Sequence, residues 1–139
     1  MPAGRTGAYL ILVHLKKEQT LRIGRLGRIL FARGNYAYVG SAMAGLEARV
    51  ARHLRKQKRV KWHIDFLLRK AEVLGAALFP SKRRNECALA RSVLNFRGAL
   101  AVPGFGCSDC RCTGHLFFLG DTPFGKLLRE LDRKGGEAR

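Results

Sequence analysis

The stretch AYLILVHL at residues 8–15 decides the fold of this chain. Both the odd-numbered and the even-numbered residues are apolar as far as residue 13, so in an extended strand both faces would carry apolar side chains. A strand with this pattern is covered on both faces by other parts of the protein. The sequence therefore predicts a strand near the beginning of the chain that is buried on both sides.

The rest of the chain alternates strand-like and helical segments. Residues 21–23 and 28–32 flank a Gly-rich turn at 24–27, which is typical of a hairpin. The other predicted elements are strands at 36–40, 73–79 and 115–119 and helices at 45–57, 62–72, 83–97 and 123–132. This order predicts an α/β (α+β) fold with a small, largely antiparallel sheet flanked by helices. We expect residues 1–139 to form a single domain with its core at about 7–119.

The charge of the chain indicates its partner. The 27 Lys and Arg outnumber the 10 Asp and Glu, which gives a net charge of +17. Repulsion of this size opposes a compact state unless a polyanion relieves it, and nucleic acid is the commonest polyanion. No segment approaches the ~20 apolar residues of a membrane helix, and no signal peptide is recognisable. We therefore predict a cytoplasmic protein that binds nucleic acid and no membrane.

The periodicity of the predicted helix at 45–57 indicates which of its residues face the core and which face solvent. At 100° per residue, Leu46, Val50 and Leu54 form its buried stripe. His53 shares that face, and Arg49 lies at its edge, where it can emerge at the rim of the sheet. The other basic residues of this helix are expected to point away, toward solvent or a phosphate backbone: Arg52, Arg55 and Lys56.

Two short motifs lie on neighbouring predicted strands, GAY at residues 7–9 and YVG at residues 38–40. The second continues as SA at 41–42, GLEAR at 45–49 and RH at 52–53. In this order the segments resemble the opening of the GIY-YIG nuclease superfamily, and its homing endonucleases in particular.

The resemblance continues over roughly residues 7–119 and is closest to a branch of that superfamily whose function is unknown. The segments that carry it are WHID at 62–65, EC at 86–87, GFG at 104–106, SDC at 108–110, a further Cys at 112, and HLF at 115–117.

The resemblance implies an endonuclease that cleaves phosphodiester bonds in DNA, with structure-specific repair or recombination as its setting. Tyr9 and Tyr38 would handle a proton or position the water, and Arg49 would stabilise the phosphate. Glu86 would hold one divalent ion, Mg²⁺ or Mn²⁺, and His53 matches a histidine of the homing endonucleases.

These residue types suit phosphodiester chemistry on their own terms. Cleavage gathers negative charge on the phosphorane oxygens, so a fixed cation stabilises it, and a guanidinium offers forked donors for phosphate. A metal ion can activate water or steady the leaving oxygen. A Tyr, with its usual pKa of about 10, is a poor base unless its surroundings assist it.

Each position also has a plain structural interpretation. Tyr9 and Tyr38 could be strand aromatics with satisfied hydroxyls, and His53 a packed core histidine. Arg49 could be one charge of a solvated helix. Glu86 opens an apolar helix face and needs a partner there, but the helix dipole alone also favours a first-turn Glu.

Further interpretations stay open beside these. Asp65 and Glu72 are rival metal ligands, and His63 is either structural or catalytic. The alternative function is a non-catalytic nucleic-acid-binding module that keeps the fold and the basic surface.

The chain departs from the superfamily in one spacing. Tyr9 and Tyr38 are separated by 28 residues, more than is usual, and the extra length contains the Gly-rich turn. We interpret it as an added hairpin that could contact DNA. The residues predicted to bind nucleic acid are Arg25, Arg28, Arg52, Arg55, Lys56 and Arg59.

A cysteine-rich segment follows at residues 107–115. Cys107, Cys110, Cys112 and His115 are ligand types for Zn²⁺, but four ligands within nine residues make a cramped site. We therefore prefer a loop stiffened by Cys and Asp packing to a zinc site, and a third function, a cysteine- or zinc-based RNA-binding protein, rests on this segment. Cys87 stands alone in the sequence.

Overall fold

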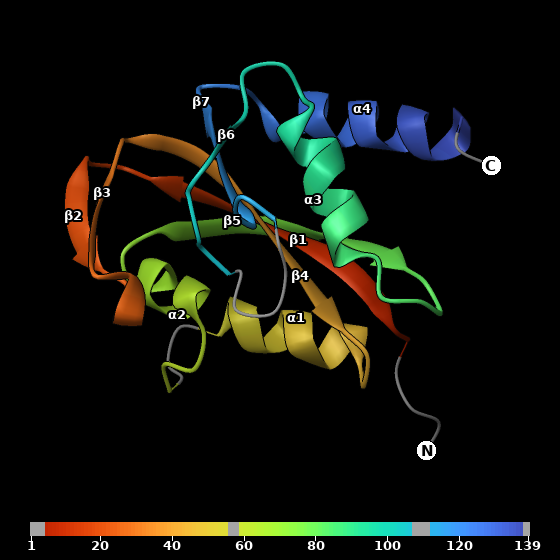
Figure 1. Ribbon diagram of the computed structural model, residues 1–139, viewed down its shortest axis with the longest axis horizontal. Helices are drawn as coiled ribbons and strands as arrows, with labels where there is room; N and C mark the ends of the chain where they lie inside the picture. Colours follow the sequence, from red (N-terminus) through yellow and green to blue (C-terminus); the bar gives the residue numbers. More distant parts are fainter. Residues whose placement is uncertain (1–4, 56–58, 107–111, 138–139) are drawn as a thin grey trace.

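A five-stranded antiparallel sheet forms the centre of the computed structural model, which describes residues 5–55, 59–106 and 112–137 (Figure 1). The strands lie in the order β5-β1-β4-β7-β6. Their bounds are Gly7–Leu15 for β1, Gly34–Ala42 for β4, Glu72–Pro80 for β5, Leu100–Ala101 for β6 and Leu116–Gly120 for β7. β1 is hydrogen-bonded to β4 on one side and to β5 on the other.

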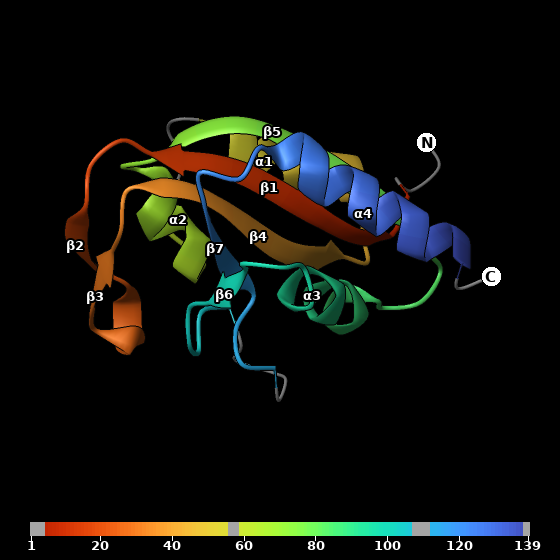
Figure 2. The ribbon, with the colours of Figure 1, turned by 90° about the horizontal axis from the view of Figure 1, so that it is seen from above.

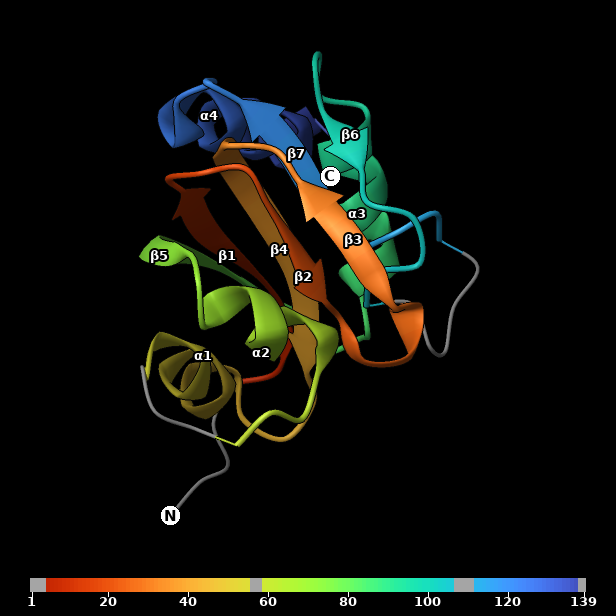
Figure 3. The same cartoon turned by 90° about the vertical axis from the view of Figure 1, so that its left-hand side faces the viewer.

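Helices cover both faces of this sheet (Figures 1 and 3). α1 (Leu46–Leu54) and α2 (His63–Leu68) lie on one face, and α3 (Glu86–Leu94) and α4 (Phe124–Glu137) lie on the other. Each face of the sheet has its own hydrophobic core, the first under α1 and α2 and the second under α3 and α4. The odd-numbered side chains of β1 from Tyr9 to Leu15 pack in the first core, and its even-numbered ones from Ala8 to Leu12 pack in the second. The apolar pattern on both sides of β1 therefore follows from two separate helical layers.

The extra length between the two motif strands forms a hairpin, as the sequence predicts. β2 (Gln19–Arg22) and β3 (Arg28–Phe31) make a two-stranded sheet of their own at one end of the molecule (Figure 2). A short 3-10 turn, Gly24–Leu26, joins them, and Gly24 and Gly27 have φ angles of 49° and 77°, which favour glycine. Ile23 and Phe31 anchor the hairpin in the first core.

The α+β fold class with its antiparallel sheet is confirmed, but several boundaries differ from the prediction. α1 ends at Leu54 because the next residue, Arg55, already has an extended backbone. Leu54 is 48% exposed, so it is not part of the buried stripe as predicted. α3 begins at Glu86 and not near residue 83, and the two-residue strand β6 has no sequence counterpart. None of the described helices is both long and apolar enough to cross a bilayer.

Candidate active site

An open cleft of about 690 Å³ lies on the α1 side of the sheet. Its lining includes Tyr9 from β1, Tyr38 from β4, Arg49 from α1 and Glu86 from α3. Four of the residues that the resemblance singled out thus reach one cleft from four elements, although up to 76 residues separate them in the sequence.

The cleft lies where the sheet stops short. β7 pairs with β4 only as far as Leu116 opposite Tyr38, and one further bond, from Val39 N to the His115 carbonyl (2.8 Å), continues the contact. No described strand covers this side of β4 at residues 40–42. Because the edge is open there, Glu86 from the far helical layer reaches the same cleft as Tyr9 and Tyr38.

Tyr9 is held over the strand beside it. It lies opposite Gly40 in the register of β1 and β4, and a Cβ built on Gly40 would overlap the Tyr9 hydroxyl and ring. The hydroxyl is 2.7 Å from Nε2 of His53, which is 1% exposed. The prediction that His53 lies on the buried face of its helix is confirmed, and its ring meets Tyr9 at hydrogen-bonding distance.

The two cleft tyrosines are neutral at ordinary pH. Burial raises the pKa of Tyr9 to about 12, although the nearby Arg49 charge lowers it in part. Burial also raises the pKa of Tyr38 far above its usual value. The third tyrosine, Tyr36, donates its hydroxyl to the Ala32 carbonyl at 2.6 Å, so it belongs to the core and not to the cleft.

The GFG segment supports Tyr38 from one side. Phe105 is fully buried and packs edge-on against Tyr38, with ring centroids 6.1 Å apart. The Gly106 N–H donates to Nδ1 of His63 at 2.8 Å, and burial lowers the pKa of His63, which keeps this nitrogen an acceptor. The structural interpretation of His63 is therefore supported, because its Nδ1 accepts this backbone hydrogen bond.

Arg49 is fixed at the rim of the cleft. Its Nη1 donates to the Ser41 carbonyl at 3.1 Å, and its guanidinium lies 4.6 Å from the centre of the Trp62 ring. Two more cations line the same cleft, Lys61 and Arg84. Trp62, Lys61 and Arg84 were not assigned a role from the sequence, because their approach to Arg49 and Glu86 depends on how the chain folds.

The expectation that Arg52 points away from the protein is wrong. Its guanidinium donates to both carboxylate oxygens of Asp65 at 3.1 Å, and its side chain is 17% exposed. Asp65 is buried and also accepts the N–H groups of Lys61 and Trp62 at the start of α2. Although burial alone would raise the pKa of Asp65, these donors hold it below its usual value. Asp65 thus has a structural role at the start of α2, and it is not among the residues that line the cleft.

Glu86 is the first residue of α3 and the only carboxylate among the described residues that line the cleft. Its side chain is 20% exposed and makes a long ion pair with Nη1 of Arg84 at 3.5 Å, and Nδ1 of His115 lies 3.9 Å from its other oxygen. Glu72, the other rival ligand, lies exposed on β5 beside a different hollow. Glu86 is therefore the described carboxylate that is best placed to hold a cation in this cleft.

Cys87 does not stand alone in the structure. Its thiol lies 4.0 Å from Nε2 of His115, and the donor atoms of Cys87, Cys112 and His115 all lie within 4.8 Å of one another. Cys107 and Cys110, which the sequence grouped with Cys112, lie outside the described residues. A cluster that could hold a metal ion thus forms from residues of two separate segments.

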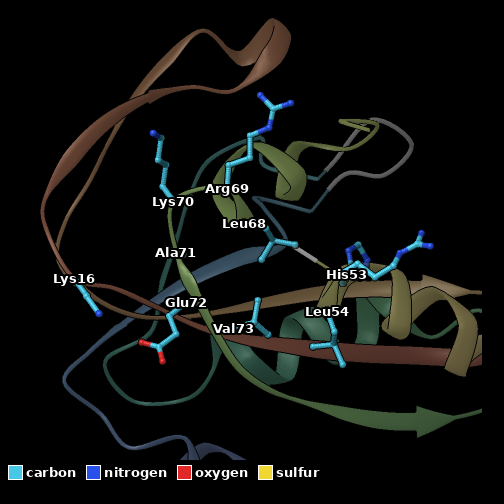
Figure 4. Close-up of a pocket in the computed structure, with 10 residues that line it drawn as sticks. Lys16, His53, Leu54, Leu68, Arg69, Lys70, Ala71, Glu72 and Val73 are labelled. Atoms are coloured by element: carbon cyan, nitrogen blue, oxygen red, sulfur yellow. The ribbon is translucent and has the colours of Figure 1, made fainter. Parts of the chain in front are cut away.

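A second hollow, of about 670 Å³, opens at the C-terminal end of α1 (Figure 4). Lys16, Arg69 and Lys70 surround it, and His53 lines it from the side of the core. Since Tyr9 lines the cleft and His53 lines this hollow, the contact between their side chains connects the two.

The remaining residues predicted to bind nucleic acid are distributed over the surface. Arg25 and Arg28 are exposed on the β2–β3 hairpin, and Arg55 and Arg59 are exposed on either side of residues 56–58. Lys56 lies outside the described residues.

A family model described as "Domain of unknown function DUF123" matches residues 8–134, which is nearly the whole chain. The chain belongs to this family. Comparison with curated proteins and with solved structures gives no match. All of the DUF123 site residues described above lie inside the matched range.

Proposed function

We propose that this DUF123 domain is a divalent-metal-dependent endonuclease that cleaves phosphodiester bonds in DNA, in a manner similar to GIY-YIG nucleases. The observation that carries the proposal is the cleft itself, where a hydrogen-bonded Tyr9–His53 pair, a fixed Arg49 and a lone carboxylate, Glu86, meet. These residue types suit phosphodiester cleavage, and they come from three elements, β1, α1 and α3.

Arg49 would bind the scissile phosphate. One of its five N–H donors is used by the Ser41 carbonyl, and the Trp62 ring holds the plane of the guanidinium. Arg49 also interacts with the Tyr9 hydroxyl, and its other donors would bind phosphate oxygens in the forked arrangement that a guanidinium favours. Because the group is held before substrate arrives, it can stabilise the charge that develops in the transition state.

Tyr9 and His53 would remove the proton of the attacking water. A Tyr with a pKa near 12 does not ionise by itself at neutral pH. The Tyr9 hydroxyl can however pass its proton to Nε2 of His53, in the tautomer in which that nitrogen accepts, as it takes the proton of the water. In this proposal Tyr9, and not Tyr38, handles the proton, because its hydroxyl is the one that lies at hydrogen-bonding distance from His53.

Glu86 fits a hard divalent cation. Mg²⁺ and Mn²⁺ take oxygen ligands, and Mg²⁺ usually binds through one or two carboxylates, several waters and the phosphates of the substrate. The largely buried carboxylate of Glu86 matches this requirement, because its contacts with Arg84 at 3.5 Å and His115 at 3.9 Å are long enough to leave room for an ion. Such an ion would stabilise negative charge on the phosphate and the leaving oxygen.

The surface charge supports a nucleic-acid substrate. A net charge of +17 attracts the phosphate backbone of any nucleic acid, and three cations, Arg49, Lys61 and Arg84, line the cleft itself. The same surface would also serve a module that binds without cutting, so the two functions must be separated by activity.

The deciding experiment is a nicking assay. Supercoiled plasmid, branched DNA and RNA are incubated with the protein and Mg²⁺ or Mn²⁺. We expect nicking of a DNA substrate, reduced about 100-fold or more in Arg49→Ala and in Glu86→Gln, since removing one electrostatic contact to a transition state has this effect.

Matched controls are provided by the second hollow. Arg69→Ala and Glu72→Gln remove the same residue types from a surface outside the cleft and should cut like the wild type. If the wild-type protein binds every substrate in a salt-sensitive way and cuts none, the non-catalytic module is correct. If Arg49→Ala and Glu86→Gln still nick, the activity belongs elsewhere.

A further inference from the structure

We infer that Cys87, Cys112 and His115 bind Zn²⁺, in a site separate from the hard cation of the cleft, and that this zinc ties the first turn of α3 to the beginning of β7. The three donor atoms lie within 4.8 Å of one another, and His115 is 2% exposed. Two thiols and an imidazole are the ligands that Zn²⁺ prefers, and Mg²⁺ does not select them.

The spacing of the donors suits a tetrahedral ion. With Zn–S of about 2.3 Å and Zn–N of about 2.0 Å, a sulfur and a nitrogen ligand of one tetrahedron lie roughly 3.5 Å apart and two sulfur ligands roughly 3.8 Å. The 4.0 Å between the Cys87 thiol and Nε2 of His115 therefore needs to shrink by about 0.5 Å, and donor pairs within the 4.8 Å limit by at most about 1.3 Å. The three donors found among the described residues would leave a fourth position of the tetrahedron for another ligand.

The ion also has access from solvent. A hollow of about 360 Å³ is lined by Cys87, Cys112 and neighbouring residues of α3 and the 112–117 segment. Cys87 and His115 line the main cleft as well. The proposed zinc would thus lie between the main cleft and this hollow, where a chelator or a metal donor can reach it.

The orientation of His115 supports the assignment. Its Nε2 faces the Cys87 thiol, while its Nδ1 faces Oε2 of Glu86 at 3.9 Å. Histidines that bind metal through one nitrogen commonly present the other N–H to a carboxylate, which fixes the ring. Zinc on Nε2 would make Nδ1–H a stronger donor and draw Glu86 toward it, so the site would position the cleft carboxylate.

The zinc site can be tested without any nuclease substrate, so its failure and the failure of the proposed activity are separate results. The protein is purified after expression with added zinc, dialysed, and analysed for metal by mass spectrometry. We expect about one Zn per chain. Replacement by Co²⁺ should give the strong visible bands of a tetrahedral cobalt–thiolate centre.

Cys87 gives the most informative variant because it lies on α3, 25 residues before Cys112, and so outside the cysteine-rich segment at 107–115. Cys87→Ser should lower the zinc content at least 10-fold, whereas Cys87→His, which restores a zinc ligand, should recover it. Glu86→Gln should weaken zinc binding by about 10- to 100-fold, the effect of losing a carboxylate that orients a ligand. Circular dichroism shows whether each variant is folded.

Three results would overturn the inference. Full zinc content in folded Cys87→Ser would mean that the ion is held by the 107–115 segment alone. A wild-type protein that contains no zinc and gives no cobalt spectrum would mean that no such site exists. A disulfide between Cys87 and Cys112 in the freshly purified protein would mean that the thiols serve another purpose.

Discussion

Replacing Gly40 with alanine puts one methyl group where the Tyr9 ring already lies. The backbone at Gly40 is not in the left-handed region, so the main chain itself accepts an alanine. Adding a methyl group to a packed site costs about 1–3 kcal/mol, while Gly→Ala at a compatible backbone position stabilises by about 0.4–1 kcal/mol. We therefore expect Gly40→Ala to lower the free energy of unfolding by about 1–2 kcal/mol.

The sign should reverse when the ring is removed. Tyr9→Leu eliminates the hydroxyl, Cζ and Cε1 atoms, which are those that the new Cβ would meet. In that background Gly40→Ala should stabilise the protein by about 0.4–1 kcal/mol. Urea unfolding of the wild type, the two single variants and the double variant gives the coupling energy, which we expect to be about 1–3 kcal/mol.

A control and a refuting result complete the test. Gly75 on β5 also has an ordinary backbone and has open space at its Cβ position, so Gly75→Ala should be neutral or stabilising. If Gly40→Ala costs the same with Tyr9 and with Leu at position 9, the glycine is required by its own strand and not by the tyrosine.

Three further predictions follow from individual contacts. Asp65→Asn should lower the free energy of unfolding by about 3 kcal/mol, measured by urea unfolding, because it leaves the Arg52 charge without its carboxylate. A change near zero would contradict a structural ion pair. Arg25→Ala and Arg28→Ala should each reduce the salt dependence of DNA binding by about 0.9 in log–log slope, measured by anisotropy, whereas Arg52→Ala should leave it unchanged. The third concerns alkaline pH. Unfolded Tyr ionises near 10 but Tyr9 keeps its proton to about 12, so raising the pH favours the unfolded state. Tyr9 should account for about 1.4 kcal/mol of stability lost by pH 11, and an equal loss in Tyr9→Phe would refute this.

The fold could be predicted from the sequence because its signals are local. The two apolar sides of β1 indicate cover on both faces, and glycines mark the β2–β3 turn. The errors arise where local pattern carries little information. Leu54 continues the apolar period of α1, but the helix ends there and leaves it exposed. The strand Leu100–Ala101 is too short to have a period and exists only because β7 pairs with it.

The candidate site could be predicted less well, because its contacts join distant segments. Motif order groups Tyr9, Arg49 and Glu86, and all three line one cleft in the structure. The partners of these and neighbouring residues could not be read from the chain. Arg52 looked solvent-exposed by helix phase until Asp65 packed against it, and Cys87 looked isolated because its neighbours follow 25 and 28 residues later.

Because β7 pairs with only part of β4, the cleft at the open edge combines residues from both helical layers, and this has a consequence for folding. Arg49 belongs to the helical layer on one face of the sheet, and Glu86 to the layer on the other. A partly folded chain in which only one layer has docked would contain the sheet but no complete cleft. Hydrogen exchange should then find conditions in which α3 opens before β1 does, and the cleft would be lost in that state while most of the protein stays protected. Assembly of this site thus reports that both halves of the domain have closed.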